Sequence, residues 1–425
     1  MSTTLVQEPQ RQSLLATSSV LFVHNAYRLR GGEDLAVERD VQLLESRGHL
    51  IGKVIFDNRD IPDPIKGRQA LRLAIDTVWS RKAITRILEE LDRRPYDVVH
   101  FHNTFPLISP AALAACAQRG LAVVQTLHNY RLVCPNGLLF RSGRPCEDCI
   151  PKTIAFPAVL HGCVRKSRPE SAVVAAMLAV HKYRGTWSKD VDVFVALTNF
   201  AKSKLVAGRI PERLITTRPN FLEPDPGPSV GRRDSFLFAG RLSVEKGVTE
   251  MLAAWPVDLS APLVIAGDGP LSVRARSIAA GKPSVLFLGD LSHEAVLDQM
   301  RRAVALIFPS RCYENFPTTI LEAFASGTPV IASRLGSTSE IVQDGHTGIL
   351  FDPEDGADFS AKMTWAWSHR QELERMGANA REEYLERYRG IQAYETLIGI
   401  YDLALKRAQV RGGARVSITA SAQSR

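Results

Sequence analysis

Glu314 and Glu322 stand eight positions apart, and the stretch between them has the composition of an anion-binding turn. An apolar run at 305–308 predicts a strand, a polar loop follows it, and a short helix then runs to Gly327. The first N–H groups of such a helix have no partner within the helix, and the helix dipole is positive there, so the turn suits a phosphate. The two carboxylates beside it can bind hydroxyl groups. These features predict a nucleotide-sugar pocket, and surface acids at a helix start are the alternative.

Two further loops follow predicted strands in the same half of the chain. Gly240-Arg241-Leu242-Ser243-Val244-Glu245-Lys246-Gly247 comes after a strand at 235–239. Its Arg241 and Lys246 would stabilise the charge that develops on a diphosphate leaving group, or they are ordinary surface cations. Gly267-Asp268-Gly269 closes the strand at 263–266. Its glycines allow a ligand close to the backbone, but the turn lacks the full G-x-G-x-x-G pattern, and a plain tight turn fits equally well.

The first half of the chain offers two polar strand ends. Gly31 and Gly32 follow a predicted strand at 20–24 and open a helix, where backbone N–H groups can approach a phosphate or an acceptor hydroxyl. Glycines at an ordinary strand-to-helix turn are the alternative. His128 ends a strand at 122–128, which directs it at the cleft, although a lone histidine is usually structural or a surface residue.

Four cysteines lie in a loop-rich insertion at 134–163. They are Cys134, Cys146, Cys149 and Cys163, with the spacing C-x11-C-x2-C-x13-C. Four thiolates that include a Cys-x-x-Cys pair suit tetrahedral zinc, and a site without an open position would be structural. Reduced free thiols are the alternative.

Composition places the chain among soluble globular proteins. Its 425 residues exceed the usual size of one core, and 45% are hydrophobic. The formal net charge of +8 favours anionic partners, but the arginines form no single stripe. Neither a signal peptide nor an apolar run long enough to cross a membrane is visible, which predicts a cytoplasmic protein with reduced or metal-bound cysteines. Arg68, Arg72, Arg81, Lys82 and Arg86 would meet anionic lipid at the inner face of the membrane, or they form a solvated helix face.

Alternating strand and helix patterns predict an α/β fold with two doubly wound domains facing a cleft. The expected boundaries are a disordered N-terminus at 1–17, an N-terminal domain at 18–218 that binds the acceptor, and a proline-rich linker at 219–228. The second, donor-binding domain is expected at 229–390, a C-terminal helix at 391–407 and a disordered tail at 408–425.

On these residues the chain resembles the retaining glycosyltransferases of family 4, which have the GT-B fold. Glu314 to Glu322 matches the E-x7-E motif of that family, and 240–247 matches its G-R-x4-K-G loop. The resemblance implies transfer of a sugar from a nucleoside diphosphate to a glycan or lipid-linked acceptor in polysaccharide or glycolipid synthesis. It implies no catalytic metal and no nucleic-acid partner.

The resemblance also assigns roles to residues. Arg241 and Lys246 would neutralise the donor diphosphate, Glu322 would bind the ribose, and Glu314 would contact the transferred sugar. His128 would lie near the reacting carbon, and Gly31 and Gly32 near donor and acceptor. The backbone of Phe316, Pro317, Thr318 and Thr319 would meet phosphate or sugar. Asn315-Phe316-Pro317 stands where many members have a Gly-Phe-Gly type sequence.

Two other functions fit parts of the sequence. A sugar-nucleotide epimerase of the same fold would turn over the donor without an acceptor. A nucleic-acid-binding protein would use a zinc-cysteine module and the positive charge, and its affinity would depend on salt.

Overall fold

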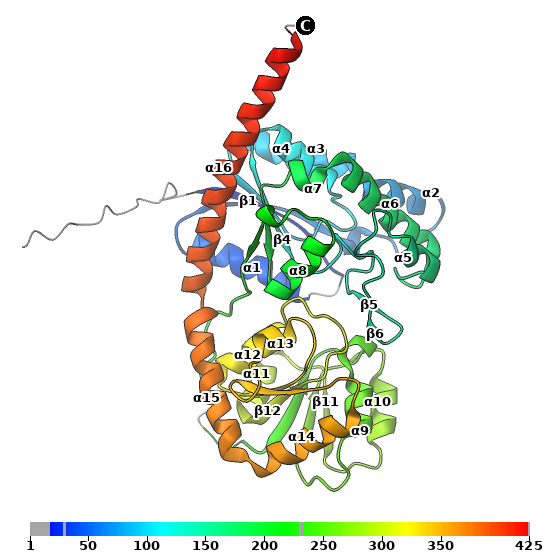
Figure 1. Ribbon diagram of the computed structural model, residues 1–425, viewed down its shortest axis with the longest axis vertical. Helices are drawn as coiled ribbons and strands as arrows, with labels where there is room; N and C mark the ends of the chain where they lie inside the picture. Colours follow the sequence, from blue (N-terminus) through cyan, green and yellow to red (C-terminus); the bar gives the residue numbers. More distant parts are fainter. Residues whose placement is uncertain (1–17, 29–30, 229–230, 232, 424–425) are drawn as a thin grey trace, which may run out of the picture.

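The computed structural model describes residues 18–28, 31–228, 231 and 233–423, with side chains up to residue 412. The predicted disordered N-terminus at 1–17 lies outside the described residues. Figure 1 shows two α/β domains, one above the other, with α15 and α16 running along one side of both. No helix among the described residues is both long and apolar enough to span a bilayer.

The first domain is built on a six-stranded parallel sheet with the order β2-β1-β3-β4-β7-β8. Its strands are β1 (Ser19–Ala26), β2 (Leu50–Asp57), β3 (Val98–Phe101), β4 (Ala122–Leu127), β7 (Val193–Ala196) and β8 (Ile215–Thr217). Its helices are α1 (Gly32–Glu45), α2 (Gly67–Val78), α3 (Arg81–Arg93), α4 (Ala111–Gln118), α5 (Phe156–His161), α6 (Arg168–Arg184), α7 (Thr186–Lys189) and α8 (Asn199–Ala207). The cysteine-rich insertion adds a short hairpin, β5 (Phe140–Arg141) and β6 (Arg144–Pro145).

The second domain repeats the plan with the strand order β11-β10-β9-β12-β13-β14, again all parallel. Its strands are β9 (Ser235–Ala239), β10 (Leu263–Ala266), β11 (Val285–Gly289), β12 (Ala303–Phe308), β13 (Val330–Ser333) and β14 (Gly348–Phe351). Its helices are α9 (Val248–Ala254), α10 (Ser272–Ala279), α11 (His293–Arg302), α12 (Thr318–Ala325), α13 (Thr338–Ile341) and α14 (Gly356–Ser368), and α15 (Arg370–Arg387) and α16 (Gly390–Gln423) follow. Short 3₁₀ turns occur at Asn58–Asp60, Glu212–Leu214 and Val244–Lys246.

The predicted α/β class with two doubly wound sheets is confirmed. Central strands such as β3 and β12 are apolar at nearly every position and wholly buried, because helices cover both faces of each sheet. The proline-rich segment at 219–228 joins the sheets without forming a helix or strand.

The C-terminal helix is longer than the sequence predicts. The predicted disordered tail at 408–425 is wrong as far as Gln423, where α16 ends, and the last two residues lie outside the described chain. The helix returns to the first domain, where it packs against β3, β4 and β7. Arg411 donates to both carboxylate oxygens of Asp192 at 2.8 Å and to the carbonyl of Leu121, and these bonds hold the helix beyond the predicted end.

The topology puts the sequence motifs at the places where doubly wound sheets bind ligands. In each sheet the chain changes direction between two neighbouring strands, β1 and β3 in the first sheet and β9 and β12 in the second. Ligands bind outside the carboxyl ends of such strands. Tyr27 and Arg28 follow β1, the loop at 240–247 follows β9, and the loop at 309–317 follows β12.

Candidate functional site

The loop after β9 and the loop after β12 are fastened to each other. Gly247 adopts a φ of +69°, and a Cβ there would lie 2.0 Å from the carbonyl oxygen of Pro309. Only glycine permits that approach. The N–H of Arg311 donates to the carbonyl of Glu245 at 2.8 Å. The two loops therefore form one rigid unit.

Lys246 and Glu314 meet within this unit. The Nζ of Lys246 lies 2.6 Å from Oε1 of Glu314, and the same oxygen accepts a hydrogen bond from the Ser310 hydroxyl at 2.7 Å. Burial alone would raise the pKa of Glu314, but the charge of Lys246 and the bonds to Lys246 and Ser310 hold it below its ordinary value. Burial alone would likewise lower the pKa of Lys246, yet the carboxylate keeps it raised. Both groups are therefore charged at neutral pH.

Arg241 stands apart from this pair. Its side chain is exposed, and in the described part of the chain it makes no hydrogen bond or ion pair. A guanidinium without a partner at the carboxyl end of β9 is available to an anion.

The turn Gly267-Asp268-Gly269 has a structural role in this protein. A Cβ on Gly267 would lie 2.0 Å from the carbonyl oxygen of Gly240, and one on Gly269 would lie 2.6 Å from that of Leu242. Asp268 accepts from the N–H of Gly269 at 2.6 Å and accepts a bond from the hydroxyl of Ser272 in the first turn of α10. The glycines thus let this turn pack directly against the backbone of the loop at 240–247.

The start of α12 offers unpaired N–H groups. Pro317 is its N-cap, and no side chain caps the first turn. The N–H groups of Thr318 and Thr319 have no partner within the helix, and in the described chain no other group accepts from them. Phe316 is buried against Tyr388, which fixes the loop in front of the helix.

Glu322 is buried, although it lies opposite the apolar face of α12. Its Oε1 lies 3.0 Å from Nε2 of His293 on α11. Arg39 of α1 in the first domain is near enough for the two charges to interact. Glu322 therefore faces the first domain.

The loop after β12 also contacts the first domain directly. The Nδ2 of Asn315 donates to the carbonyl of Leu127 at 2.8 Å, immediately before His128. The hydroxyl of Tyr130 donates to the carbonyl of Glu314 at 3.2 Å. The structure thus brings the Glu314 loop and the His128 strand end together, as the sequence predicts for a shared cleft.

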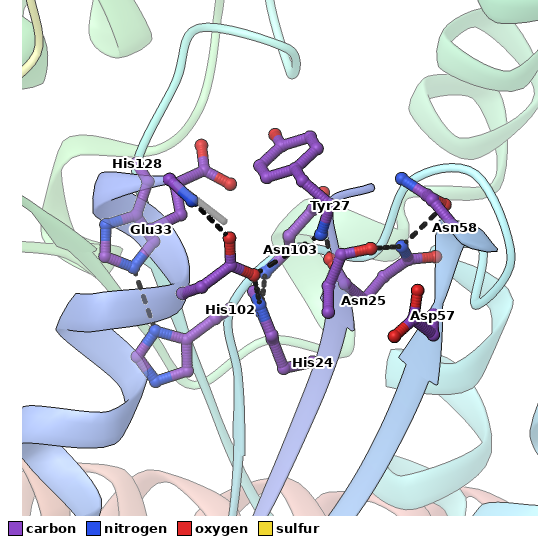
Figure 2. Close-up of polar contacts among 12 residues, drawn as sticks. His24, Asn25, Tyr27, Glu33, Asp57, Asn58, His102, Asn103 and His128 are labelled. Carbon is purple, nitrogen blue, oxygen red and sulfur yellow. Dashed lines mark hydrogen bonds and ion pairs between the residues drawn. The ribbon is translucent and has the colours of Figure 1, made fainter. Parts of the chain in front are cut away.

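His128 is paired with a histidine that the sequence motifs do not single out. Figure 2 shows the two imidazoles joined by one contact, which is 2.9 Å between Nδ1 of His102 and Nε2 of His128. The rings are stacked at 5.2 Å, and His102 in turn stacks on Phe22. Burial lowers the pKa of His128 to about 4 and that of His102 well below its usual range. Both rings are therefore neutral at pH 7, and one nitrogen of the contact donates while the other accepts.

Gly31 is the N-cap of α1, and its N–H is already used, because it donates to the Asp34 carboxylate at 2.8 Å. Gly32 is exposed and open to a ligand. Glu33, the next residue, accepts from the side-chain amide of Asn129 at 2.7 Å and lies beside His128 in Figure 2. Burial raises the pKa of this carboxyl group.

A small cavity of about 30 Å³ lies at these strand ends, lined by Glu33, His102 and His128 among others. One carboxylate oxygen of Glu33 and Nε2 of His102 have no partner in the described chain. Such a cavity accommodates about one or two water molecules or a hydroxyl group of a ligand. The feature of the sequence that could have identified His102 is its position just after β3, one of the two strands between which the chain changes direction.

The four cysteines of the insertion are free thiols. They lie near enough for their charges to interact. Burial, and after it the charge of Cys134, raises the pKa of Cys149 to about 12. Among the described residues no three His, Cys, Asp or Glu side chains are placed to hold a metal ion. The positions as they stand do not form a ready tetrahedral site, and zinc binding by these thiols stays a prediction.

Taken together, the site can bind a phosphorylated, hydroxyl-rich ligand. It offers a free guanidinium, an ion-paired ammonium, two carboxylates, two unpaired N–H groups and a neutral imidazole, at the facing strand ends of two sheets.

Comparison with known proteins identifies the family of this chain. Residues 53–225 match the family model of Glycosyltransferase Family 4, and residues 223–383 match that of Glycosyl transferases group 1. The chain is 37% identical over 153 residues to D-rhamnosyltransferase WbpZ of Pseudomonas aeruginosa, covering 35% of this chain and 40% of that protein. It is 30% identical over 314 residues to D-inositol 3-phosphate glycosyltransferase 1 of Catenulispora acidiphila, covering 65% and 67%.

The chain covers less than two thirds of the length of two of these relatives. It covers 40% of WbpZ and 60% of sulfoquinovosyl transferase SQD2 from Arabidopsis thaliana. Among solved structures, Anabaena Alr3699/HepE in complex with UDP superposes with a TM-score of 0.62 over 89% of this chain and 98% of that chain. At 15% identity this likeness shows the fold, which is GT-B. The two family models and the relative covered over two thirds of its length lead to one conclusion: the chain belongs to glycosyltransferase family 4.

Proposed function

We propose that this protein transfers a sugar from a nucleoside diphosphate sugar to a hydroxyl group of a glycan or lipid-linked acceptor, with retention of anomeric configuration. One observation carries the proposal. Lys246 and Glu314 form a charged pair between the loops after β9 and β12, and Asn315, next to Glu314, contacts the strand end that bears His128. One loop thus connects the cation–carboxylate pair to the strand end that bears the imidazole.

The donor's diphosphate would lie against Arg241, Lys246 and the N–H groups of Thr318 and Thr319. Fixed positive groups at that position stabilise the charge that grows on the leaving diphosphate. Glu322 would accept hydrogen bonds from the ribose, and Glu314 from the hydroxyl groups of the sugar. Neutral His128 adds no charge repulsion near the anomeric carbon, and its contact with His102 fixes the orientation of the ring.

The reaction would proceed on one face of the sugar. The bond between the anomeric carbon and the phosphate oxygen breaks, and the leaving diphosphate keeps the electron pair. The acceptor oxygen forms the new bond on the same face, and its proton passes to the leaving phosphate oxygen. No metal takes part in these steps.

Binding and turnover test the proposal. Purified protein is screened by thermal shift against UDP-, GDP- and ADP-sugars, and zinc content is measured on the same preparation. Release of nucleoside diphosphate is then followed with and without added acceptor glycans. We expect stabilisation by one class of donor and acceptor-dependent release. Turnover without acceptor would favour an epimerase, and no affinity for any activated sugar would refute the proposal.

Arg241→Ala isolates the diphosphate contact. Its turnover is expected to fall by about 10²–10³-fold, with the thermal stability unchanged because Arg241 has no partner in the described chain. The matched control is Arg274→Ala, an exposed arginine on α10, which should leave turnover unchanged.

A further inference from the structure

Three helices of the first domain form an outward layer that leaves large apolar side chains in solvent. α6 contacts both α2 and α5. Figure 1 shows the three gathered on the side of the domain opposite α16. One face of α6 is apolar and turned to solvent, since Ala172, Ala176, Val180 and Tyr183 are exposed at helical spacing.

The neighbouring helices extend this apolar face. Leu71 and Ile75 of α2 are 64% and 58% exposed, and Phe156 and Leu160 of α5 are 62% and 50% exposed. Ile154 before α5 and Tyr183 at the end of α6 are 60% and 94% exposed. Large apolar side chains gathered over adjacent helices mark an interaction surface more often than a solvated one.

The same surface is strongly basic. The segments 66–78 and 152–184 contain two acids, Asp76 and Glu170. Their exposed cations are Lys66, Arg68, Arg72, Lys152, Arg165, Lys166, Arg168 and Arg184. Apolar side chains surrounded by Lys and Arg are the composition of a surface that lies on an anionic bilayer. The three other predicted lipid contacts, Arg81, Lys82 and Arg86, are on α3, outside this surface, and Arg86 lies over the ring of Phe56.

A groove within this layer shares one residue with the site. It lies between α2 and the start of α6, has a volume of about 270 Å³, and is lined by Ala70, Leu73, Ala74, Val173 and Val174 among others. Its lining also includes Phe105 and Pro106. Phe105 also lines the small cavity that contains His102 and His128. An apolar chain in the groove would therefore end beside the proposed acceptor position.

We propose that the outward surface of α2, α5 and α6 docks on an anionic lipid bilayer, and that the groove between α2 and α6 receives the hydrocarbon of a lipid-linked acceptor. The second half of this statement rests on the proposed glycosyltransferase function, and the first half does not. Docking places the first domain on the membrane and leaves the donor loops of the second domain facing the aqueous phase.

Vesicle sedimentation with the full chain tests the docking. One set of vesicles is phosphatidylcholine, and the other contains about 30 mol% phosphatidylglycerol. The test variant is Phe156→Glu with Leu160→Glu. The matched control is Val257→Glu with Val273→Glu, two apolar residues of the second domain that are 79% and 85% exposed. Both variants change the charge equally, and circular dichroism checks that each is folded.

The expected result is binding to the anionic vesicles only, weakened when NaCl is raised from about 0.1 M to about 0.5 M. Binding by the test variant should be at least about 10-fold weaker, and binding by the control should match the unmodified protein. Absence of vesicle binding, or equal loss in both variants, overturns the docking surface. A dimer in sedimentation velocity that only the test variant dissociates, without vesicle binding, assigns the surface to a second copy of the chain and also overturns the proposal.

A further variant separates docking from acceptor binding. Ala74→Trp fills the groove without adding charge and should leave vesicle binding unchanged. If the groove receives the acceptor chain, this variant should lose at least about 10-fold in turnover with a long-chain lipid acceptor and keep its turnover with a short soluble one. Equal turnover with both acceptors refutes the groove assignment. If the protein binds vesicles but no sugar nucleotide, the docking stands and the proposed function fails.

Discussion

Replacing Lys246 with methionine tests the centre of the proposed site. The substitution removes an ammonium that lies 2.6 Å from the Glu314 carboxylate, in a place where the two side chains are only 28% and 15% exposed. Glu314 would keep its bond from Ser310 but lose its counter-ion. Two quantities should change, the free energy of unfolding and the turnover, for different physical reasons.

The loss of stability follows from the stranded carboxylate. Breaking a fully buried pair by removing one partner costs about 3–5 kcal/mol, and the partial exposure here lowers our expectation to about 2–4 kcal/mol. Turnover should fall by about 10²–10³-fold, because one fixed cation at the leaving diphosphate is lost. Lys246→Ala removes the same ion pair and should lower the free energy of unfolding for the same reason.

A double variant separates the two effects. Lys246→Met with Glu314→Gln removes the stranded charge, so its stability should recover most of the loss while its turnover stays low. Urea denaturation measures the first quantity and nucleoside diphosphate release the second. Lys53→Met, which breaks the half-exposed pair with Glu45 at 3.0 Å, is the control and should change stability by less than about 1 kcal/mol. Turnover within twofold of the unmodified protein in Lys246→Met would refute the assignment of Lys246 to the diphosphate.

The buried pair of Asp40 and Arg218, 2.6 Å apart, joins α1 to the segment after β8. Asp40→Ala should lower the free energy of unfolding by about 3–5 kcal/mol in urea denaturation. The control Asp92→Ala, in the exposed pair with Arg119, should lower it by less than about 1 kcal/mol. Gly247→Ala should lower the free energy of unfolding by about 1–3 kcal/mol and weaken donor binding, because its Cβ would clash with the Pro309 carbonyl. Gly281→Ala, where an added Cβ has no atom within 4 Å, should leave thermal denaturation nearly unchanged. His102→Phe keeps the ring stack but removes the contact to His128, so turnover should fall by up to about 10²-fold with donor affinity retained; His181→Phe, at a buried histidine outside the site, should keep the turnover of the folded fraction. The hydrogen bond to Glu322 raises the pKa of His293 above 6.5. The contribution of this pair to stability is therefore complete below about pH 6.5 and is lost as the pH rises through the raised pKa of the folded protein. Because His293 is half exposed, this loss should stay under about 1 kcal/mol, and a profile of melting temperature against pH for His293→Gln should lack it.

The fold, and the meeting of the loops that carry the sequence motifs, could be predicted from the sequence for a simple physical reason. Strands of a parallel sheet buried on both faces read as apolar runs, and β9, β10 and β12 were each followed by glycine or charged residues. Since the carboxyl ends of parallel strands share one edge, motifs that follow separate strands must converge. The meeting of Lys246 with Glu314 is an instance of this rule.

What the sequence did not indicate depends on contacts between distant segments. The partner of His128 is His102, 26 positions away, and only the alignment of β3 beside β4 brings them together. The glycines of the turn at 267–269 looked suited to a ligand, but in the structure they make room for the carbonyls of Gly240 and Leu242. Beyond the predicted end of α16, Arg411 bonds to Asp192, a contact between distant segments that no local propensity encodes.

The Lys246–Glu314 pair also explains how Lys246 stays charged in this site when no anionic ligand is bound. A lysine buried alone would lose its proton, because burial favours the neutral amine. Glu314 reverses that tendency and keeps the pKa of Lys246 raised, so the charge is present before the donor arrives. Arg241 needs no such partner, since a guanidinium stays protonated at any physiological pH. Glu314 therefore has two tasks in the proposed reaction, contact with the sugar and maintenance of the lysine charge, and a variant at this position alone cannot separate them.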